Sequence, residues 1–229
     1  MHVIEKVRLD RSRHAAPQVF EKLREAILSL ELTPGTVLAR NVLAEQFGIS
    51  QTPIRDALMR LGEEGLVDIF PQHATVVSRI DVRAAREAHF LRRSIELEIV
   101  RGLAQRAPEG LAGRLQAQMA LQTTLAAAQN YRDFVAADQE FHHLMYEAAG
   151  VPGLWDLVRR MSGHVDRLRR LHLPTAGKTE AILRDHQAIA EAIARQDPEG
   201  AQTALRAHLS GTLSSLDEIC ARYPEYVAA

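Results

Sequence analysis

Acidic and histidine side chains occur at helical spacing on apolar helix faces in the second half of the chain. Asp138 and His142 are four residues apart in a predicted helix over residues 131–149, so they share one face. His186 lies among isoleucines in a predicted helix over 178–195, and His208 lies among alanine and leucine in one over 199–221. One aspartate with three histidines suits zinc, nickel or manganese. These four residues are therefore candidate ligands of a divalent metal ion.

The same four residues also have an ordinary structural explanation. Asp138 can pair with His142, while the other two histidines can be hydrogen-bonded core residues, because buried imidazoles need partners with or without a metal. From spacing alone we favour this core cluster, since single histidines on apolar faces are common. His143 points about 100° away from its neighbour His142, and we expect His164 and His172 to be solvated.

Polar residues at the start of a short helix form a second candidate site. Residues 41–47 and 51–64 predict two helices joined by a tight turn at Gly48, which is the spacing of a helix-turn-helix. Ser50 is placed to cap the second helix. The apolar stripe of that helix consists of Ile54, Ala57, Leu58 and Leu61. The alternative is a generic helical hairpin with a solvated outer face.

The outer face of the second helix carries side chains suited to DNA. Gln51 and Thr52 can bond to base edges or phosphate, and Arg55 can bind phosphate or guanine. Around these helices, residues 16–30 predict a further helix, and β-rich runs at 66–70 and 74–77 predict a hairpin. From residue 81 onward helix formers dominate. The predicted helices there cover 81–106, 110–128, 131–149, 153–170, 178–195 and 199–221.

Length and composition bound the class of protein. The 229 residues are enough for two domains, and the change in pattern near residue 80 divides them into 1–79 and 80–229. The net charge is -1, so charge gives no support to DNA binding, although residues 1–13 are mildly cationic and form either a tail or a DNA-contacting arm. One cysteine, no signal-peptide pattern and no run of ~20 apolar residues lead us to expect a cytoplasmic protein without a membrane anchor.

Residues 23–77 resemble the winged helix-turn-helix of the GntR regulator family, most clearly where LAEQFGIS is followed by TPIRDAL. The family contacts DNA through the start of the recognition helix and the wing tip. The resemblance implies DNA contacts at Ser50, Gln51, Thr52 and Arg55, at His73 in the wing, and at Arg40 before the first helix of the motif. Two residues depart from the family pattern. Gln51 replaces the usual arginine and favours adenine over guanine, and Ala74 replaces a glycine of the wing tip.

Residues 83–222 resemble the FCD ligand-binding domain of the FadR-like branch, over AADQEFHHLMYEAAG and RDHQAIAEAIARQDPEGAQTALRAHL. That domain is an antiparallel helical bundle. The resemblance implies a metal ion at Asp138, His142, His186 and His208, and it reverses the preference for a plain core cluster. It also implies a small carboxylate effector beside the metal, with Arg92 as its contact. Because Arg92 precedes Glu96 by four residues, a helix-surface ion pair is the alternative.

Together these observations predict a mainly α protein, with an N-terminal winged helix-turn-helix and a C-terminal antiparallel all-helical bundle. We expect a homodimeric repressor of transcription that binds operator DNA, a divalent metal and a small organic acid, and that is not an enzyme. One alternative is a metal-dependent hydrolase fused to a DNA-binding module, which the lack of an evident general base disfavours. Another is a DNA-binding scaffold without an effector, which predicts no ligand-induced change in DNA affinity.

Overall fold

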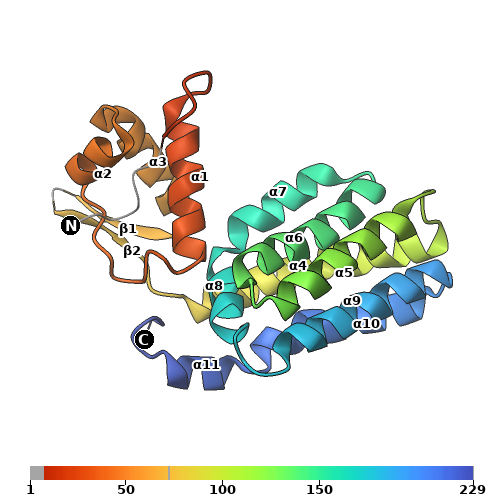
Figure 1. Cartoon of the computed structure of the whole chain (residues 1–229). Helices are drawn as coiled ribbons and strands as arrows, with labels where there is room; N and C mark the ends of the chain where they lie inside the picture. The colour runs from red at the N-terminus through yellow and green to blue at the C-terminus, as the bar shows by residue number, and fades with distance from the viewer. Residues whose placement is uncertain (1–7, 72, 229) are drawn as a thin grey trace. The chain divides into compact units, whose positions relative to one another are not determined.

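The computed structural model describes residues 8–71 and 73–228, and it divides into two compact units (Figure 1). The N-terminal unit contains the described residues up to 85, residues 163–170 and the described residues from 218 onward. The helical unit contains residues 86–162 and 171–217. Lys6 of the predicted arm and Gln72 of the predicted hairpin turn lie outside the described residues.

The N-terminal unit is a winged helix-turn-helix. Its elements are α1 (Ala15–Leu28), α2 (Arg40–Phe47), α3 (Gln51–Glu63), β1 (Val67–Phe70) and β2 (Ala74–Val77). The strands form an antiparallel hairpin that pairs Val67 with Val77 and Phe70 with Ala74. The predicted apolar stripe of α3 is buried in one core with the apolar face of α1, which includes Val19, Leu23 and Ile27. The helix-turn-helix prediction is confirmed, because hydrophobic burial fixes which face of α3 points outward.

The turn before α3 differs in one detail from the prediction. Gly48 ends α2 with φ 66°, a left-handed conformation that favours glycine, and Ser50 is extended at the N-cap of α3. Ser50 therefore occupies the predicted N-cap position, but its side chain makes no capping hydrogen bond, and that part of the prediction is wrong. A cap accepts from the second or third amide of its helix, and the third residue is Pro53, which has no N–H.

The second half of the chain is entirely helical over its named elements. They are α4 (Val82–Gln105), α5 (Leu111–Ala127), α6 (Tyr131–Ala148), α7 (Pro152–Met161), α8 (Gly163–His172), α9 (Lys178–Ala194), α10 (Pro198–Leu213) and α11 (Leu216–Arg222). In the helical unit α5 packs against α6 and α9, and α9 packs against α10. Side chains cap two helix starts, with Asn130 accepting from Asp133 N and Asp197 accepting from Gly200 N. Within the described residues, no helix has the length and apolar character that a membrane span requires.

Two of the predicted helices are each broken in two. The predicted helix over 153–170 is α7 and α8, separated at Ser162, and the one over 199–221 is α10 and α11, separated at Ser214 and Ser215. At the first break the Ser162 hydroxyl donates to Val158 O at 2.7 Å, and at the second the Ser214 hydroxyl donates to Gly211 O at 3.2 Å. Serine hydroxyls compete in this way with backbone hydrogen bonding and favour helix ends.

Candidate functional site

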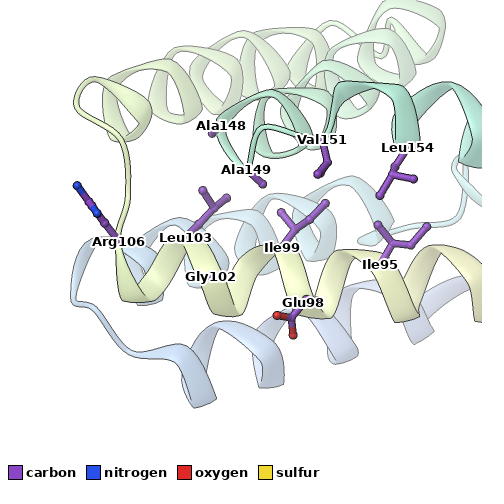
Figure 2. A pocket seen from close by; sticks show the side chains of 10 residues that line it. All are labelled: Ile95, Glu98, Ile99, Gly102, Leu103, Arg106, Ala148, Ala149, Val151 and Leu154. Atoms are coloured by element: carbon purple, nitrogen blue, oxygen red, sulfur yellow. The ribbon is translucent and has the colours of Figure 1, made fainter.

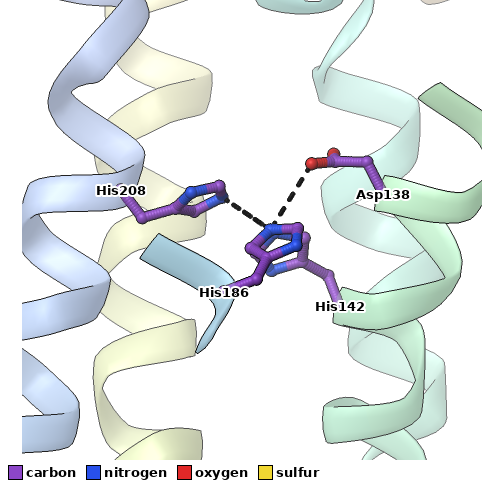
Figure 3. Close-up of side chains that lie close together, drawn as sticks. All are labelled: Asp138, His142, His186 and His208. Carbon is purple, nitrogen blue, oxygen red and sulfur yellow. Dashed lines mark hydrogen bonds and ion pairs between the residues drawn. The ribbon is translucent and has the colours of Figure 1, made fainter. Parts of the chain in front are cut away.

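Asp138, His142, His186 and His208 meet in the interior of the helical unit (Figure 3). Two come from α6, one from α9 and one from α10, and all four are buried. His208 Nε2 lies 3.1 Å from His142 Nε2 and 3.4 Å from His186 Nε2, and His186 Nε2 lies 3.5 Å from Asp138 Oδ1. One ligand atom from each residue falls within 4.8 Å of all the others. The four side chains predicted as ligands are thus brought to a single point.

The other ring nitrogen of each histidine faces an oxygen atom. His186 Nδ1 is hydrogen-bonded to Gln122 Oε1 at 2.9 Å. His142 Nδ1 lies 3.0 Å from Glu96 Oε2, and His208 Nδ1 lies at a longer 3.7 Å from Asp185 Oδ2. At His186 the oxygen acceptor on Nδ1 places the proton of a neutral imidazole there and leaves Nε2 with a lone pair. His186 is therefore oriented as metal-ligating histidines usually are, and His142 and His208 turn the same ring nitrogen toward a carboxylate.

This arrangement tests whether the residues fit a metal ion. When Nδ1 carries the proton, all three Nε2 atoms are acceptors, and acceptors 3.1–3.4 Å apart cannot satisfy one another. Burying such groups without a partner is costly. A divalent cation at the point where they converge provides a partner for the three nitrogens and the Asp138 carboxylate together. The donor set therefore fits zinc, nickel or manganese.

A buried ion pair supports the histidine side of the cluster. Arg92 Nε donates to Glu96 Oε1 at 2.7 Å, and the Tyr146 hydroxyl donates to the same oxygen at 3.3 Å. Burial raises the pKa of Glu96, but the adjacent Arg92 and His142 more than offset this and hold it well below its usual range. Burial likewise lowers the pKa of Arg92, and the Glu96 carboxylate more than reverses the effect. Both groups are therefore charged. The Arg92–Glu96 ion pair, the alternative role considered for Arg92, is present, but it lies in the interior and not on the helix surface.

His142 stays neutral over a wide pH range. Burial lowers its pKa from 6.5 to about 4, and Glu96 opposes only part of that effect. As the pH falls below 6.5, the unfolded chain takes up a proton at this histidine before the folded chain does. The metal-free protein is therefore expected to lose stability between pH 6.5 and about 4.

The remaining histidines of interest lie elsewhere. His143 is half-buried on the outside of α6, where its ring stacks on Trp155 with centroids 5.3 Å apart, as its predicted direction requires. The expectation that His164 and His172 are solvated is wrong, because both are buried. Their burial depends on packing between segments far apart in the chain, which spacing along one helix does not reveal.

The residues predicted to contact DNA are all exposed. Gln51, Thr52 and Arg55 are exposed on α3, and Ser50 is exposed just before it. Arg40 is exposed at the first residue of α2, and His73 is exposed in the hairpin turn, where its N–H donates to Phe70 O. None of these side chains contributes to the core, so all are available to a ligand.

Sequence reasoning missed the second layer of the cluster, which is formed by Glu96 and Gln122. A signal for both exists in the apolar periodicity. Glu96 precedes Val100 by four residues and Leu103 by seven, and Gln122 follows Met119 by three, so each polar residue lies on a buried helix stripe. A polar residue on such a stripe needs a buried partner, and here the partner is a histidine of the cluster.

A surface groove of about 540 Å³ runs between α4 and the start of α7 in the helical unit (Figure 2). Its apolar lining includes Ile95, Ile99 and Leu103 of α4 and Leu154 of α7, with Glu98 and Arg106 among the polar residues. Phe90, further toward the start of α4, is 73% exposed. The groove and its surroundings form an apolar surface that does not include the histidine cluster.

Comparison with known proteins identifies both units. Residues 15–77 match "Bacterial regulatory proteins, gntR family", and residues 87–211 match the FCD domain. The chain is 33% identical over 210 residues to an uncharacterized HTH-type transcriptional regulator in an unstable DNA locus of Streptomyces ambofaciens, which covers 92% of this chain and 88% of the relative. It is 28% identical over 202 residues to the HTH-type transcriptional repressor RspR of Escherichia coli K12, covering 88% and 89%. E. coli McbR/YncC has a similar fold, with TM-score 0.77 at 20% identity over 90% of this chain and 98% of that one.

The buried pair Arg92–Glu96 yields a prediction about stability. Arg92→Met leaves the Glu96 carboxylate buried without its cation, so urea unfolding of the EDTA-treated protein should show a loss of about 3–5 kcal/mol. Adding Glu96→Leu removes the second charge and should recover much of this loss. As a control, Arg195→Ala breaks only an exposed pair with Glu191 and should change stability little. A double variant no more stable than Arg92→Met would contradict the ion-pair interpretation.

Proposed function

Because the chain belongs to the gntR family of bacterial regulatory proteins and carries an FCD domain, we propose that a metal-dependent sensor in its helical unit controls its affinity for operator DNA. The chain is a DNA-binding transcriptional regulator and not an enzyme, and the expected family, fold class and general function are confirmed. The observation that carries the metal part of the proposal is the convergence of three Nε2 atoms and one carboxylate oxygen.

The metal ion is held by Asp138, His142, His186 and His208 in this proposal. When bound, it supplies a Lewis-acidic centre with coordination positions left for an exogenous ligand. Glu96 and Gln122 hold the rings of His142 and His186 so that their Nε2 atoms face the ion. Because the ligands come from α6, α9 and α10, metal binding ties three helices together.

The effector is a small organic acid that binds at or beside the metal. Three neutral imidazoles and one carboxylate leave a divalent ion with one positive charge, while the charges of Arg92 and Glu96 cancel each other. An anion is therefore the ligand that neutralises the site. Arg92 is the nearest candidate for a carboxylate clamp, and it serves that role while keeping its Nε on Glu96, because guanidinium has further N–H donors.

The DNA contacts of one chain come from the start of α3, with Ser50, Gln51, Thr52 and Arg55, and from Arg40 and His73 beside it. One helix-turn-helix covers a single half-site, so specific recognition calls for two copies related by two-fold symmetry. We place the second copy on the apolar groove between α4 and α7, because this surface exposes large apolar side chains such as Phe90 and Leu154. The relative RspR is named a repressor, and we propose the same direction of regulation here.

Substitutions on α3 test the DNA contacts. Arg55→Ala and Thr52→Ala should each weaken binding to a DNA duplex selected by the wild-type protein, by about 1–3 kcal/mol for a base contact. Both side chains are exposed, so the melting temperature should stay the same. Arg195→Ala on the exposed end of α9 serves as the control in a fluorescence anisotropy titration. If the Arg55/Thr52 double variant bound the duplex with full affinity, this face of α3 would be ruled out as the DNA-contacting face.

Chelation tests the metal site. A ligand that binds only the folded state stabilises it by mass action, so EDTA should lower the melting temperature and added zinc, nickel or manganese should restore it. His186→Ala and His208→Ala should each lose most of the restoration, whereas His143→Ala should keep it because that ring stacks on Trp155 outside the cluster. If no added ion shifts melting and elemental analysis finds no metal, the four residues are a hydrogen-bonded core cluster.

Light scattering tests the dimer. The wild-type protein should have the mass of two chains at micromolar concentration, and Leu154→Glu should shift it toward one chain by placing a charge in the groove. Leu121 is 46% exposed on α5, away from the groove, so Leu121→Glu is the matched control and should remain dimeric. A wild-type monomer, with and without DNA, would refute the dimer; dissociation by Leu121→Glu alone would place the interface elsewhere.

A further inference from the structure

The first turns of α8 belong to the N-terminal unit although the sequence places them among the sensor helices. Gly163 opens α8 against Leu66, the fully buried residue between α3 and β1. A Cβ atom on Gly163 would lie 2.6 Å from Leu66 Cδ2, a distance that side-chain carbons do not adopt. Glycine is therefore needed at this position to let α8 approach the base of the wing.

Arg167 is the main link between α8 and the segment that leaves the wing. Its side chain is completely buried, and it donates through one terminal nitrogen to Ser78 O at 2.6 Å and through the other to Ser78 Oγ at 3.2 Å. Ser78 Oγ in turn donates to Gly65 O at 2.6 Å, directly after α3. Burial lowers the pKa of Arg167 to about 10, with Asp68 opposing the effect, so the guanidinium remains charged at neutral pH.

His164 completes the same cluster, one helical turn before Arg167. Its Nδ1 accepts from Asp81 N at 3.0 Å and lies 3.0 Å from a terminal nitrogen of Arg167. Two donors on Nδ1 require it to be the unprotonated nitrogen of a neutral ring. Burial and the adjacent Arg167 lower the pKa of His164 to about 4, which agrees with that assignment. Asp81 itself accepts from Arg83 N and Ala84 N, so it also holds the first turn of α4.

The C-terminal segment is hydrogen-bonded to the same connection, residues 78–81. Ile80 N donates to Tyr226 O at 2.8 Å, and Ala228 N donates to Ile80 O at 3.0 Å, which pairs Ile80 with Val227 as a parallel bridge. Residues 78–81 are thus bonded both to α8 and to the C-terminal segment. Hydrogen bonds to both segments therefore hold the backbone of residues 78–81 within the N-terminal unit.

At its other end α8 leads into the sensor. Leu173 follows α8 directly and packs in a buried cluster with Phe134 and Ile182. Phe134 lies one turn before the candidate ligand Asp138 on α6, and Ile182 lies one turn before His186 on α9. A change in how α6 and α9 are held by the metal therefore acts on Leu173, which is ten residues or fewer from His164 and Arg167 in the same stretch of chain.

We infer that α8 is the coupling helix of this regulator, and that Arg167 and His164 are positioning residues that transmit the state of the sensor to α3 through Ser78 and Gly65. The inference rests on the proposed function, because it takes the helical unit to be the sensor. Arg167 and His164 contact neither DNA nor the candidate metal ligands in this account. Their substitution should abolish coupling while leaving both separate binding events in place.

Hydrogen exchange of the full chain tests the inference with two probes. The first is the divalent ion alone (zinc, nickel or manganese), which should change exchange of residues 65–81 in the EDTA-treated wild-type protein. The second is the selected DNA duplex, which should by linkage change exchange of residues 173–186. In Arg167→Met and His164→Ala both distant changes should disappear, with metal Kd within about twofold of wild type. DNA affinity should differ between metal-loaded and metal-free wild type by about 5–150-fold and by less than twofold in these variants.

Matched variants separate coupling from general damage. His164→Asn keeps an acceptor near the position of Nδ1 and should retain coupling, as should Arg195→Met at an exposed site. If Arg167→Met fails to fold, the comparison of His164→Ala with His164→Asn decides. Wild-type coupling in folded Arg167→Met and His164→Ala overturns the inference, as does a wild-type protein in which DNA leaves residues 173–186 unchanged. A DNA response without any metal response refutes the metal sensor, and loss of that DNA response in the two variants still supports coupling through α8.

Discussion

The Nε2 atoms of three buried histidines converge with a carboxylate oxygen in the interior of the helical unit, and buried polar atoms of this kind need partners. Gln122 bonds to the opposite ring nitrogen of His186, and Glu96 lies 3.0 Å from that of His142, so both residues favour rings with Nε2 directed inward. Relief by protonation is opposed by burial, which lowers the pKa of His142 to about 4. A bound cation would serve as a common partner for these atoms, and it would join α6, α9 and α10 at one point.

The two units solve the burial of charge in different ways. In the helical unit, Arg92 faces a carboxylate, so the pair is neutral and the interior accepts both charges. In the N-terminal unit, the buried Arg167 bonds to Ser78 and to its own helix at Gly163 O, and these partners are neutral. Neutral partners stabilise a buried cation less than a carboxylate does, which is consistent with opposite pKa shifts at the two arginines. The charge of the buried Arg167 is therefore balanced within the N-terminal unit by neutral acceptors, with a smaller electrostatic effect from Asp68.

Local pattern predicted the features that depend on one element. The buried stripe of α3 follows from the period of Ile54, Leu58 and Leu61, and the shared face of Asp138 and His142 follows from their spacing. Features that depend on distant partners were not accessible in this way. His164 is buried by contacts with Asp81 and Arg167, and the first of these lies 83 residues away. The break at Ser162 was missed for a related reason. The residue after it, Gly163, lies against Leu66, which is far away in the sequence.

The interleaved composition of the N-terminal unit bears on how such regulators can be recombined. A chimera that joins residues 1–80 to an unrelated sensor would leave Ser78 without Arg167 and Ile80 without its bridge to Val227. The foreign sensor would need to supply an equivalent of α8 and of the C-terminal segment. Without them, the surface of the winged helix-turn-helix that these segments cover would be exposed to solvent. A working exchange therefore needs segments equivalent to residues 163–170 and 218–228, because these belong to the same compact unit as the helix-turn-helix.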